Sequence, residues 1–127
     1  MSSNEVLKLI KDKEIDYVDL RFTDPRGKLQ HLTMDKTVVD SDMLNNGVFF
    51  DGSSIAGWKA INESDMILKP DLSRKIVDPY TSHNTLILFC DILDAVNKNP
   101  YERDPRGIAK KAEAYLKKSG VGDKAYF

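Results

Sequence analysis

The sequence has few of the residues and patterns that mark several common classes of protein. It contains one cysteine, Cys90, which excludes an internal disulfide and suits a reducing cytoplasm. Its histidines, His31 and His83, do not belong to a motif with metal-ligand spacing. No apolar run approaches the ~20 residues of a membrane span, and the start lacks a signal-peptide pattern. We therefore expect a cytoplasmic protein with no membrane association and no metal site within these residues.

The sequence also lacks an excess of either positive or negative charge. The chain has 19 Lys and Arg residues against 20 Asp and Glu residues, which gives a formal net charge of −1. Binding to nucleic-acid phosphates needs a basic excess, so no nucleic-acid partner is expected. The length of 127 residues, with 41% hydrophobic and 31% charged residues, is typical of one soluble globular domain.

Periodicity and turn signals predict an α+β fold, with a small mixed sheet packed against helices. Ser2 and Glu5 have capping-box spacing before the first helix, and Asp24-Pro25-Arg26-Gly27 fits a type I turn between two strands. Pro70 is expected to end a strand. The expected helices are 3–13, 41–46 and 105–119, and the expected strands are 17–23, 29–34, 48–50, 65–69, 76–77 and 85–91.

The strongest strand signal is the continuous apolar run from Thr85 to Asp91, which is typical of a central strand covered on both faces. Cys90 lies in this run and is interpreted as a small buried hydrophobe. Asp104 and Pro105 mark the start of the last helix. A buried stripe is expected along that helix, formed by Ile108, Ala109, Ala112, Tyr115 and Leu116.

A glycine-rich loop over residues 50–58 carries the clearest functional signal, because it holds the chain's one tryptophan, Trp58. The loop fits neither a Walker motif nor a dinucleotide fingerprint. Asp51 directly follows the predicted strand 48–50, so a rigid element would aim its carboxylate at a cation, a proton or a metal. The plainer interpretation is a surface loop in which Asp51 caps a turn. Arg103 and Arg106 are expected to be surface or interface charges.

The combination Phe50-Asp51-Gly52-Ser53-Ser54, an eight-residue gap, and 63–68 (ESDMIL) resembles the N-terminal signature of glutamine synthetases. The flanking segments EIDYVDLRFTDPRGKLQHLT, DPYTSHNTLILFCDI and YERDPRGIAKKAEAYL are similar to that family as well, and the bacterial type I enzymes are the nearest group. The resemblance implies a β-grasp (ubiquitin-like) domain over residues 1–103. Residues 104–127 would then be a helix and the start of a catalytic domain, consistent with a chain that stops in the apolar stretch Tyr126-Phe127 and reads as the first part of a longer protein.

The resemblance also implies a reaction. These enzymes join ammonia to the side-chain carboxylate of glutamate with ATP, through γ-glutamyl phosphate, and Mg²⁺ or Mn²⁺ neutralises charge on the transferred group. The family's metal ligands lie mainly in the larger C-terminal domain, so ATP and metal are expected to bind outside this chain, which should be inactive alone.

Site residues follow from the same resemblance. The family's active sites form between neighbouring subunits of a ring, in a dodecamer of two hexameric rings. Asp51 matches the aspartate that binds ammonium and helps to deprotonate it, and Ser54 matches a residue near the same site. Trp58 matches a loop tryptophan expected at the subunit contact or near the nucleotide, whereas Asp65 is expected to support the loop. The alternatives are a stand-alone β-grasp binding module and a γ-glutamyl–amine ligase of the same fold.

Overall fold

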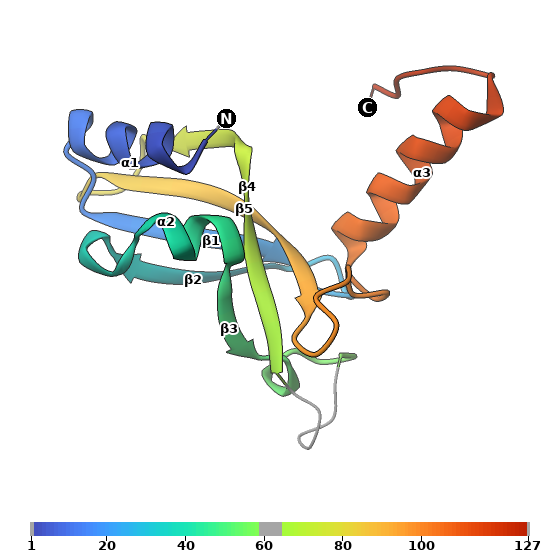
Figure 1. Ribbon diagram of the computed structural model, residues 1–127, viewed down its shortest axis with the longest axis horizontal. Helices are drawn as coiled ribbons and strands as arrows, with labels where there is room; N and C mark the ends of the chain where they lie inside the picture. The colour runs from blue at the N-terminus through green and yellow to red at the C-terminus, as the bar shows by residue number, and fades with distance from the viewer. Residues whose placement is uncertain (1, 59–64, 127) are drawn as a thin grey trace.

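A computed structural model describes residues 2–58 and 65–126, in which three α-helices and two short 3-10 helices accompany one five-stranded sheet (Figure 1). The capping box of the first helix forms as expected, because the Ser2 hydroxyl accepts a hydrogen bond from the Glu5 amide and the Glu5 carboxylate accepts one from the Ser2 amide. The elements are α1 (Ser3–Asp12), β1 (Tyr17–Thr23), β2 (Leu29–Asp35), η1 (Lys36–Val38), α2 (Ser41–Asn46), β3 (Val48–Asp51), η2 (Gly52–Ser54), β4 (Asp65–Val77), β5 (Thr85–Asp94) and α3 (Pro105–Ser119).

The sheet has the strand order β2-β1-β5-β4-β3, with β1 and β5 parallel and every other neighbouring pair antiparallel. The expected central strand is therefore confirmed as β5, and the mixed α+β architecture is confirmed with it. β1 and β2 form the expected hairpin, whose turn is held by Asp24: its Oδ1 accepts hydrogen bonds from the amides of Arg26 and Lys28. This leaves β2 and β3 as the two edges of the sheet.

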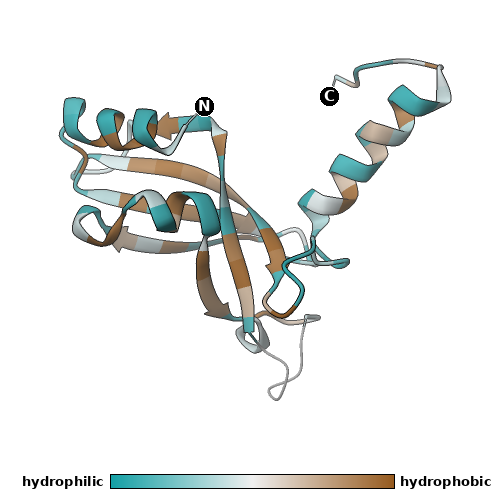
Figure 2. Cartoon of the chain, viewed as in Figure 1, coloured by the Kyte–Doolittle hydropathy of each residue, from teal (hydrophilic) through white to brown (hydrophobic). Residues whose placement is uncertain are grey.

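The hydrophobic core lies between α1, α2 and one face of the sheet (Figure 2). Alternate residues of the strands point to that face, as the period of two requires. Leu86, Leu88, Cys90 and Ile92 supply the central row, so Cys90 is the buried hydrophobe that was expected. Burial raises the pKa of the Cys90 thiol far above its ordinary value, which keeps it protonated and unreactive.

Pro70 does not end a strand, contrary to expectation. One long strand, β4, joins the two predicted segments, and the register of its pairing with β5 shifts between Pro70 and Lys75. A proline has no amide hydrogen to donate, and the irregularity places it where the ladder is already interrupted. Within the irregularity, Asp71 Oδ1 accepts hydrogen bonds from the amide and hydroxyl of Ser73, and the strand bends visibly (Figure 1).

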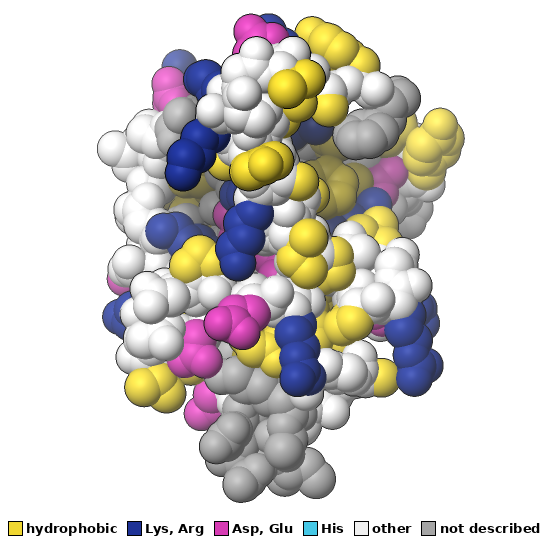
Figure 3. Space-filling model, turned by 90° about the vertical axis from the view of Figure 1, so that its right-hand side faces the viewer, with side chains coloured by type: hydrophobic (Ala, Val, Ile, Leu, Met, Phe, Trp, Pro, Cys, Tyr) yellow, Lys and Arg dark blue, Asp and Glu magenta, His cyan; other side chains and the backbone are white. Residues whose placement is uncertain are grey.

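Helix α3 stands away from the sheet, and the predicted buried stripe along it is wrong for this chain. None of its residues is buried, and the ring of Tyr115 is 72% exposed. Figure 3 looks onto this side of the molecule and shows hydrophobic side chains exposed among lysines and arginines. Amphipathic spacing indicates which helix face suits burial, but it does not supply a covering surface.

Among the helices in the described residues, none combines the length and apolarity needed to cross a membrane.

A polar cluster occupies the opposite face of the sheet from the core. Asp19 is only 4% exposed, yet it accepts hydrogen bonds from Arg21 Nε (2.8 Å) and Thr33 Oγ1 (3.0 Å), and Nδ1 of His31 lies 2.8 Å from its Oδ1. Burial by itself raises the pKa of Asp19, but the hydrogen bonds from Arg21, His31 and Thr33 outweigh it, so the pKa is lowered overall. This buried carboxylate therefore ties β2 to β1.

We predict that Asp19→Asn lowers the free energy of unfolding by about 1–3 kcal/mol near neutral pH, because an amide cannot satisfy the three donors. The native pKa of Asp19 is lowered, so its contribution is present above the unfolded pKa of about 3.9 and is lost as pH falls through the native value. Urea unfolding at neutral and acidic pH measures both effects. The exposed Asp12→Asn is the control; an equal loss in both variants would contradict the assignment.

Candidate functional site

The strand that leads to the loop is fixed in place by a glycine. Gly47 has φ of +85°, and an ideal Cβ at this position would lie 2.3 Å from the carbonyl oxygen of Leu68 on β4. A side chain here would be strained in backbone conformation and would also collide with β4. Gly47 thus lets β3 begin against β4, with Val48 opposite Leu68 and Asp51 opposite Asp65. The position of Asp51 is set by this register.

Asp51 lies at the end of β3, where it caps η2. Its Oδ1 accepts hydrogen bonds from the amide of Ser53 (2.9 Å) and from the hydroxyl of Ser53 (2.6 Å). The expectation that Asp51 caps a turn is therefore confirmed. Capping fixes the carboxylate in one orientation while the residue stays exposed. A local structural role and a ligand-binding role are compatible at this position.

Two carboxylates face each other where β3 and β4 meet. Asp51 and Asp65 are register partners on the same face of the sheet, and both are exposed. Like charges directly opposite each other in an antiparallel pair repel. A cation placed close to both would reduce that repulsion. Ser54 is also exposed, one turn further along in η2, so the loop presents a hydroxyl close in sequence to the carboxylate pair.

The far end of the loop is anchored by Trp58, which is 7% exposed. Its ring stacks on Phe22 of β1, with ring centroids 5.8 Å apart, and meets Phe50 and Tyr101 edge-on at 6.2 and 5.8 Å. Its indole Nε1 donates a 3.1 Å hydrogen bond to the carbonyl oxygen of Arg103. Trp58 therefore packs inside this chain, and its expected role at a subunit contact or near the nucleotide stays a prediction.

The segment before α3 holds the same loop from the other side. The Arg103 guanidinium donates a 3.1 Å hydrogen bond to the carbonyl oxygen of Gly57. Asp104 is buried and accepts hydrogen bonds from the amides of Ile92 and Arg106, each 3.1 Å long, so it joins β5 to the start of α3. Burial raises the pKa of the Asp104 carboxyl.

Arg106, expected to be a surface or interface charge, is partly exposed and forms ion pairs within the chain. Its Nε donates to Asp91 Oδ1 at 2.9 Å, and its guanidinium also contacts Asp71. Lys110 joins the same group through a 2.6 Å contact with Asp91 Oδ2. The residues come from β4, β5 and α3, so spacing along the sequence carried no signal for this network.

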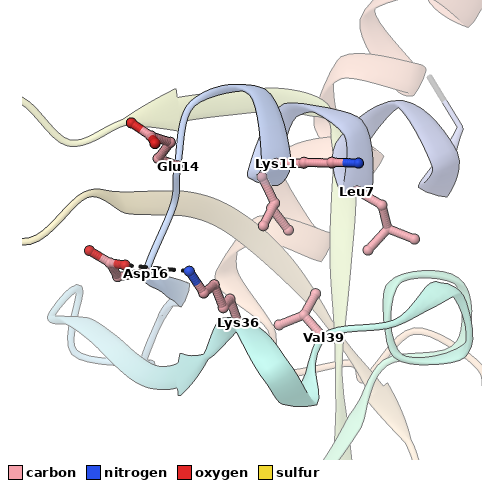
Figure 4. Close-up of a pocket in the computed structure, with 7 residues that line it drawn as sticks. Leu7, Lys11, Glu14, Asp16, Lys36 and Val39 are labelled. Carbon is pink, nitrogen blue, oxygen red and sulfur yellow. Dashed lines mark ion pairs between the residues drawn. The ribbon is translucent and has the colours of Figure 1, made fainter.

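A surface hollow lies away from the loop that carries Asp51. Between α1 and η1 there is an open hollow of about 510 Å³, lined by side chains that include Leu7 and Val39, with an ion pair of 3.6 Å between Lys36 and Asp16 at its edge (Figure 4). None of the predicted site residues lines it. The loop with Asp51 is therefore not part of this hollow.

Comparison with known proteins identifies the family. The family model described as glutamine synthetase, beta-Grasp domain matches residues 14–95. The chain belongs to the glutamine synthetase family. The match confirms the β-grasp fold expected from the resemblance, and it lies within the first of the two predicted units, whose boundary at residues 103 and 104 stays a prediction.

Individual glutamine synthetases resemble the chain over nearly its whole length. It is 62% identical to the glutamine synthetase of Rhizobium meliloti over 125 residues, which is 98% of this chain and 27% of that protein. It is 59% identical to the enzyme of Azorhizobium caulinodans, covering 99% of this chain and 27% of that protein. The chain therefore spans about a quarter of the length of these relatives.

Solved structures agree with the fold. The cryo-EM structure of Plasmodium falciparum glutamine synthetase is similar with a TM-score of 0.83 and 28% identity, covering 94% of this chain and 23% of that one. A structure of GmaS without ligand has a TM-score of 0.78 and 22% identity, covering 87% of this chain and 25% of that one, and it supports the fold alone.

The predicted residues of this glutamine synthetase domain occupy one loop, but they play different parts in it. Asp51 and Ser54 are exposed, whereas Trp58 is buried. Glu63 and Ser64, which belong to the signature, lie outside the described residues, as does Phe127. The contacts of Tyr101 and Arg103 with Trp58 leave no signal in the sequence, because only the folded chain brings these residues together.

We predict that Trp58→Ala lowers the free energy of unfolding by about 3–5 kcal/mol, because it removes the centre of the aromatic cluster. Trp58→Phe keeps most ring packing and loses the hydrogen bond to Arg103, so its cost should be smaller, nearer 1 kcal/mol. Urea unfolding followed by far-UV circular dichroism measures each value. Phe49→Ala is the control, since that ring is 69% exposed; equal losses at both positions would refute the anchoring role.

Proposed function

We propose that this chain is the ammonium-binding part of a glutamate–ammonia ligase, and that Asp51 is the residue that binds ammonium. The placement of Asp51 carries the proposal: it is exposed, fixed at the end of β3, and opposite a second carboxylate, Asp65. The relatives that cover nearly all of this chain are glutamine synthetases, which supports the same activity for the whole protein.

In the proposed reaction, Asp51 binds the ammonium ion and helps to remove a proton from it. A carboxylate about 4 Å from ammonium attracts it by about 1 kcal/mol in water, and by about 4 kcal/mol where the effective dielectric constant is near 20. A partly dry site would therefore strengthen the attraction. Ammonium must then lose a proton before its nitrogen can attack the activated γ-carboxyl carbon of glutamate and displace phosphate. The Asp51 carboxylate would receive that proton or pass it on.

Ser54 is proposed to lie at the same shared site, on the exposed side of η2. Its hydroxyl can both donate and accept a hydrogen bond, which suits contact with a polar substrate or with the opposing subunit. Asp65 is proposed to support the loop and to add negative charge beside Asp51.

ATP and Mg²⁺ or Mn²⁺ would supply and stabilise the phosphoryl group that activates glutamate. The described residues do not provide a site for the metal: nowhere in 2–58 or 65–126 do three or more His, Cys, Asp or Glu side chains come together in a way that could hold one. We therefore propose that ATP and metal bind mainly to the part of the protein that this chain does not include.

A neighbouring subunit would complete the site. The loop follows β3, an edge strand of the sheet, where it can project toward another subunit without disturbing the core. Phe49 on the same strand is 69% exposed, which suits a surface that another molecule covers. We propose a homo-oligomer of the whole protein, two hexameric rings in the form that the family resemblance implies.

Ammonia is the acceptor that the relatives' name supports. GmaS shares the fold at 22% identity, and this likeness supports the fold alone. The signature Asp51-Gly52-Ser53-Ser54 favours the ligase over a stand-alone binding module, which has no need for it. The ligase is therefore the function we propose.

In the whole protein, Asp51→Asn should lower kcat/KM for ammonia by roughly 100-fold or more, because the amide keeps the shape but loses the charge and the basic oxygen. The dissociation constant for ATP should change little, because Asp51 is not proposed to touch the nucleotide. Steady-state rates at limiting ammonia and nucleotide binding by calorimetry measure the two effects.

Asp65→Asn is the matched control for that experiment, since it removes a charge from the register partner of Asp51. A smaller effect on kcat/KM for ammonia is expected from it. An unchanged rate at limiting ammonia in Asp51→Asn would sink the assignment.

The 127-residue chain alone should form no glutamine, because we propose that ATP and metal bind mainly outside it. Incubation with glutamate, ammonia, ATP and Mg²⁺, followed by amino-acid analysis, tests this. Glutamine above the level of a protein-free control would show that the site is not shared.

A further inference from the structure

The edge of the sheet formed by β2 is unpaired along the whole strand in the described residues. β2 has seven residues, contains no proline, and pairs with β1 from end to end without a register shift. In the described part of the chain, β1 is its only hydrogen-bonded neighbour. Natural sheets usually interrupt or cover an edge of this kind, because its unpaired amides and carbonyls bind other strands. The edge is on the other side of the sheet from β3 and the proposed ammonium loop.

The side chains of β2 are sorted by face. Leu32 and Met34 lie opposite Leu20 and Val18 of β1, on the core side of the sheet. His31, Thr33 and Asp35 point to the other face, where Thr33 lies opposite Asp19. An added strand would therefore meet an apolar row on one face and a polar, charged row on the other.

The sequence of β2 is complementary to itself at one register. In an antiparallel pair related by a two-fold axis, the central residue must face its own copy, because neighbours in a strand point to opposite faces. With Thr33 at the centre, Leu32 faces Met34 of the second copy and His31 faces Asp35. Each of these contacts occurs twice. Thr33 faces Thr33, a pairing that is favourable in sheets.

A register centred on Leu32 is poorer. It would place Lys28 opposite Lys36 of the second copy and the apolar Leu29 opposite Asp35. Like charges directly opposite each other are destabilising. The charge pattern of the strand therefore favours Thr33 over Leu32 as the centre.

Hydrogen bonds within the chain already orient His31 and Asp35 for this contact. Nδ1 of His31 is held 2.8 Å from Asp19, so in the protonated ring Nε2 is the donor left for a second carboxylate. Hydrogen bonds from the amide and hydroxyl of Thr37 lower the pKa of Asp35 and keep it ionised. The side chain of His31 is 62% exposed, so a second chain can reach it.

We infer that the open edge of β2 is an interaction surface for a second copy of this chain, which binds by antiparallel β2–β2 pairing centred on Thr33. The pairing would join two five-stranded sheets into one continuous sheet. The contact is small compared with a standard protein interface, so the dimer should be weak, with a dissociation constant on the order of 100 µM. The inference does not depend on the proposed ligase activity.

Cysteine cross-linking tests the register. Two Cα atoms opposite each other in an antiparallel pair lie about 4.5–5.5 Å apart, within the range of a disulfide. Thr33→Cys should therefore form a disulfide dimer under mild oxidation, at least about tenfold faster than Leu29→Cys. Leu29 is exposed on the same face, but its two copies would be eight residues apart along the paired strands, about 26 Å. The native Cys90 is buried, and the unmodified chain gives the background.

A second measurement needs no substitution. NMR spectra of the backbone amides of the unmodified 127-residue chain should be recorded from about 10 µM to about 1 mM. The chemical shifts of Leu29–Asp35 should depend on concentration, and those of Val48–Asp51 should not. Analytical ultracentrifugation should detect the dimer over the same range. A monomer over the whole range would overturn the inference. Shifts confined to other elements, or equal cross-linking rates for Thr33→Cys and Leu29→Cys in folded variants, would overturn it as well.

Discussion

The burial of Trp58 is the interaction on which the geometry of the loop depends. The ring packs between β1, β3 and the segment before α3, and its indole hydrogen bond reaches Arg103. At the other end of the loop, the register of β3 with β4 fixes Asp51, and the cap on Ser53 orients its carboxylate. A glycine-rich segment held at both ends in this way can present polar groups in one arrangement, which binding and catalysis both require.

The two edges of the sheet differ in their suitability for interaction. β3 is short and leads into a loop with exposed carboxylates, so side-chain chemistry dominates there. β2 is longer and uninterrupted, so backbone pairing dominates there. Because β5 and its buried neighbours separate the edges, both surfaces can be used at once without competing for the same residues. The exposed apolar side of α3 offers a further surface, consistent with a chain that spans about 27% of its relatives.

Local signals in the sequence predicted most of the fold. The capping box, the Asp24 turn and the Asp104 cap are interactions between residues close in the chain, and each is present. The central strand was indicated by its continuous local run of apolar residues. Long-range pairing was not predictable in the same way. Pro70 was expected to end a strand that continues past it. The partners of Arg106, Asp71 and Asp91, lie on other elements and could not be found from spacing along the sequence. The loop itself was found from its glycines and Trp58, but burial of that ring against Phe22 and Tyr101 depends on residues more than 30 positions away.

The central claim is that Asp51 is presented to an adjoining subunit, so that two chains complete one pocket. The most direct measurement is a high-resolution structure of the whole assembled protein, in which the surroundings of the Asp51 carboxylate can be seen. We predict that this carboxylate lies within hydrogen-bonding distance, about 3 Å, of a ligand or polar group that belongs to the site of a different subunit. An Asp51 side chain in bulk solvent, with no other subunit near it, would contradict the account.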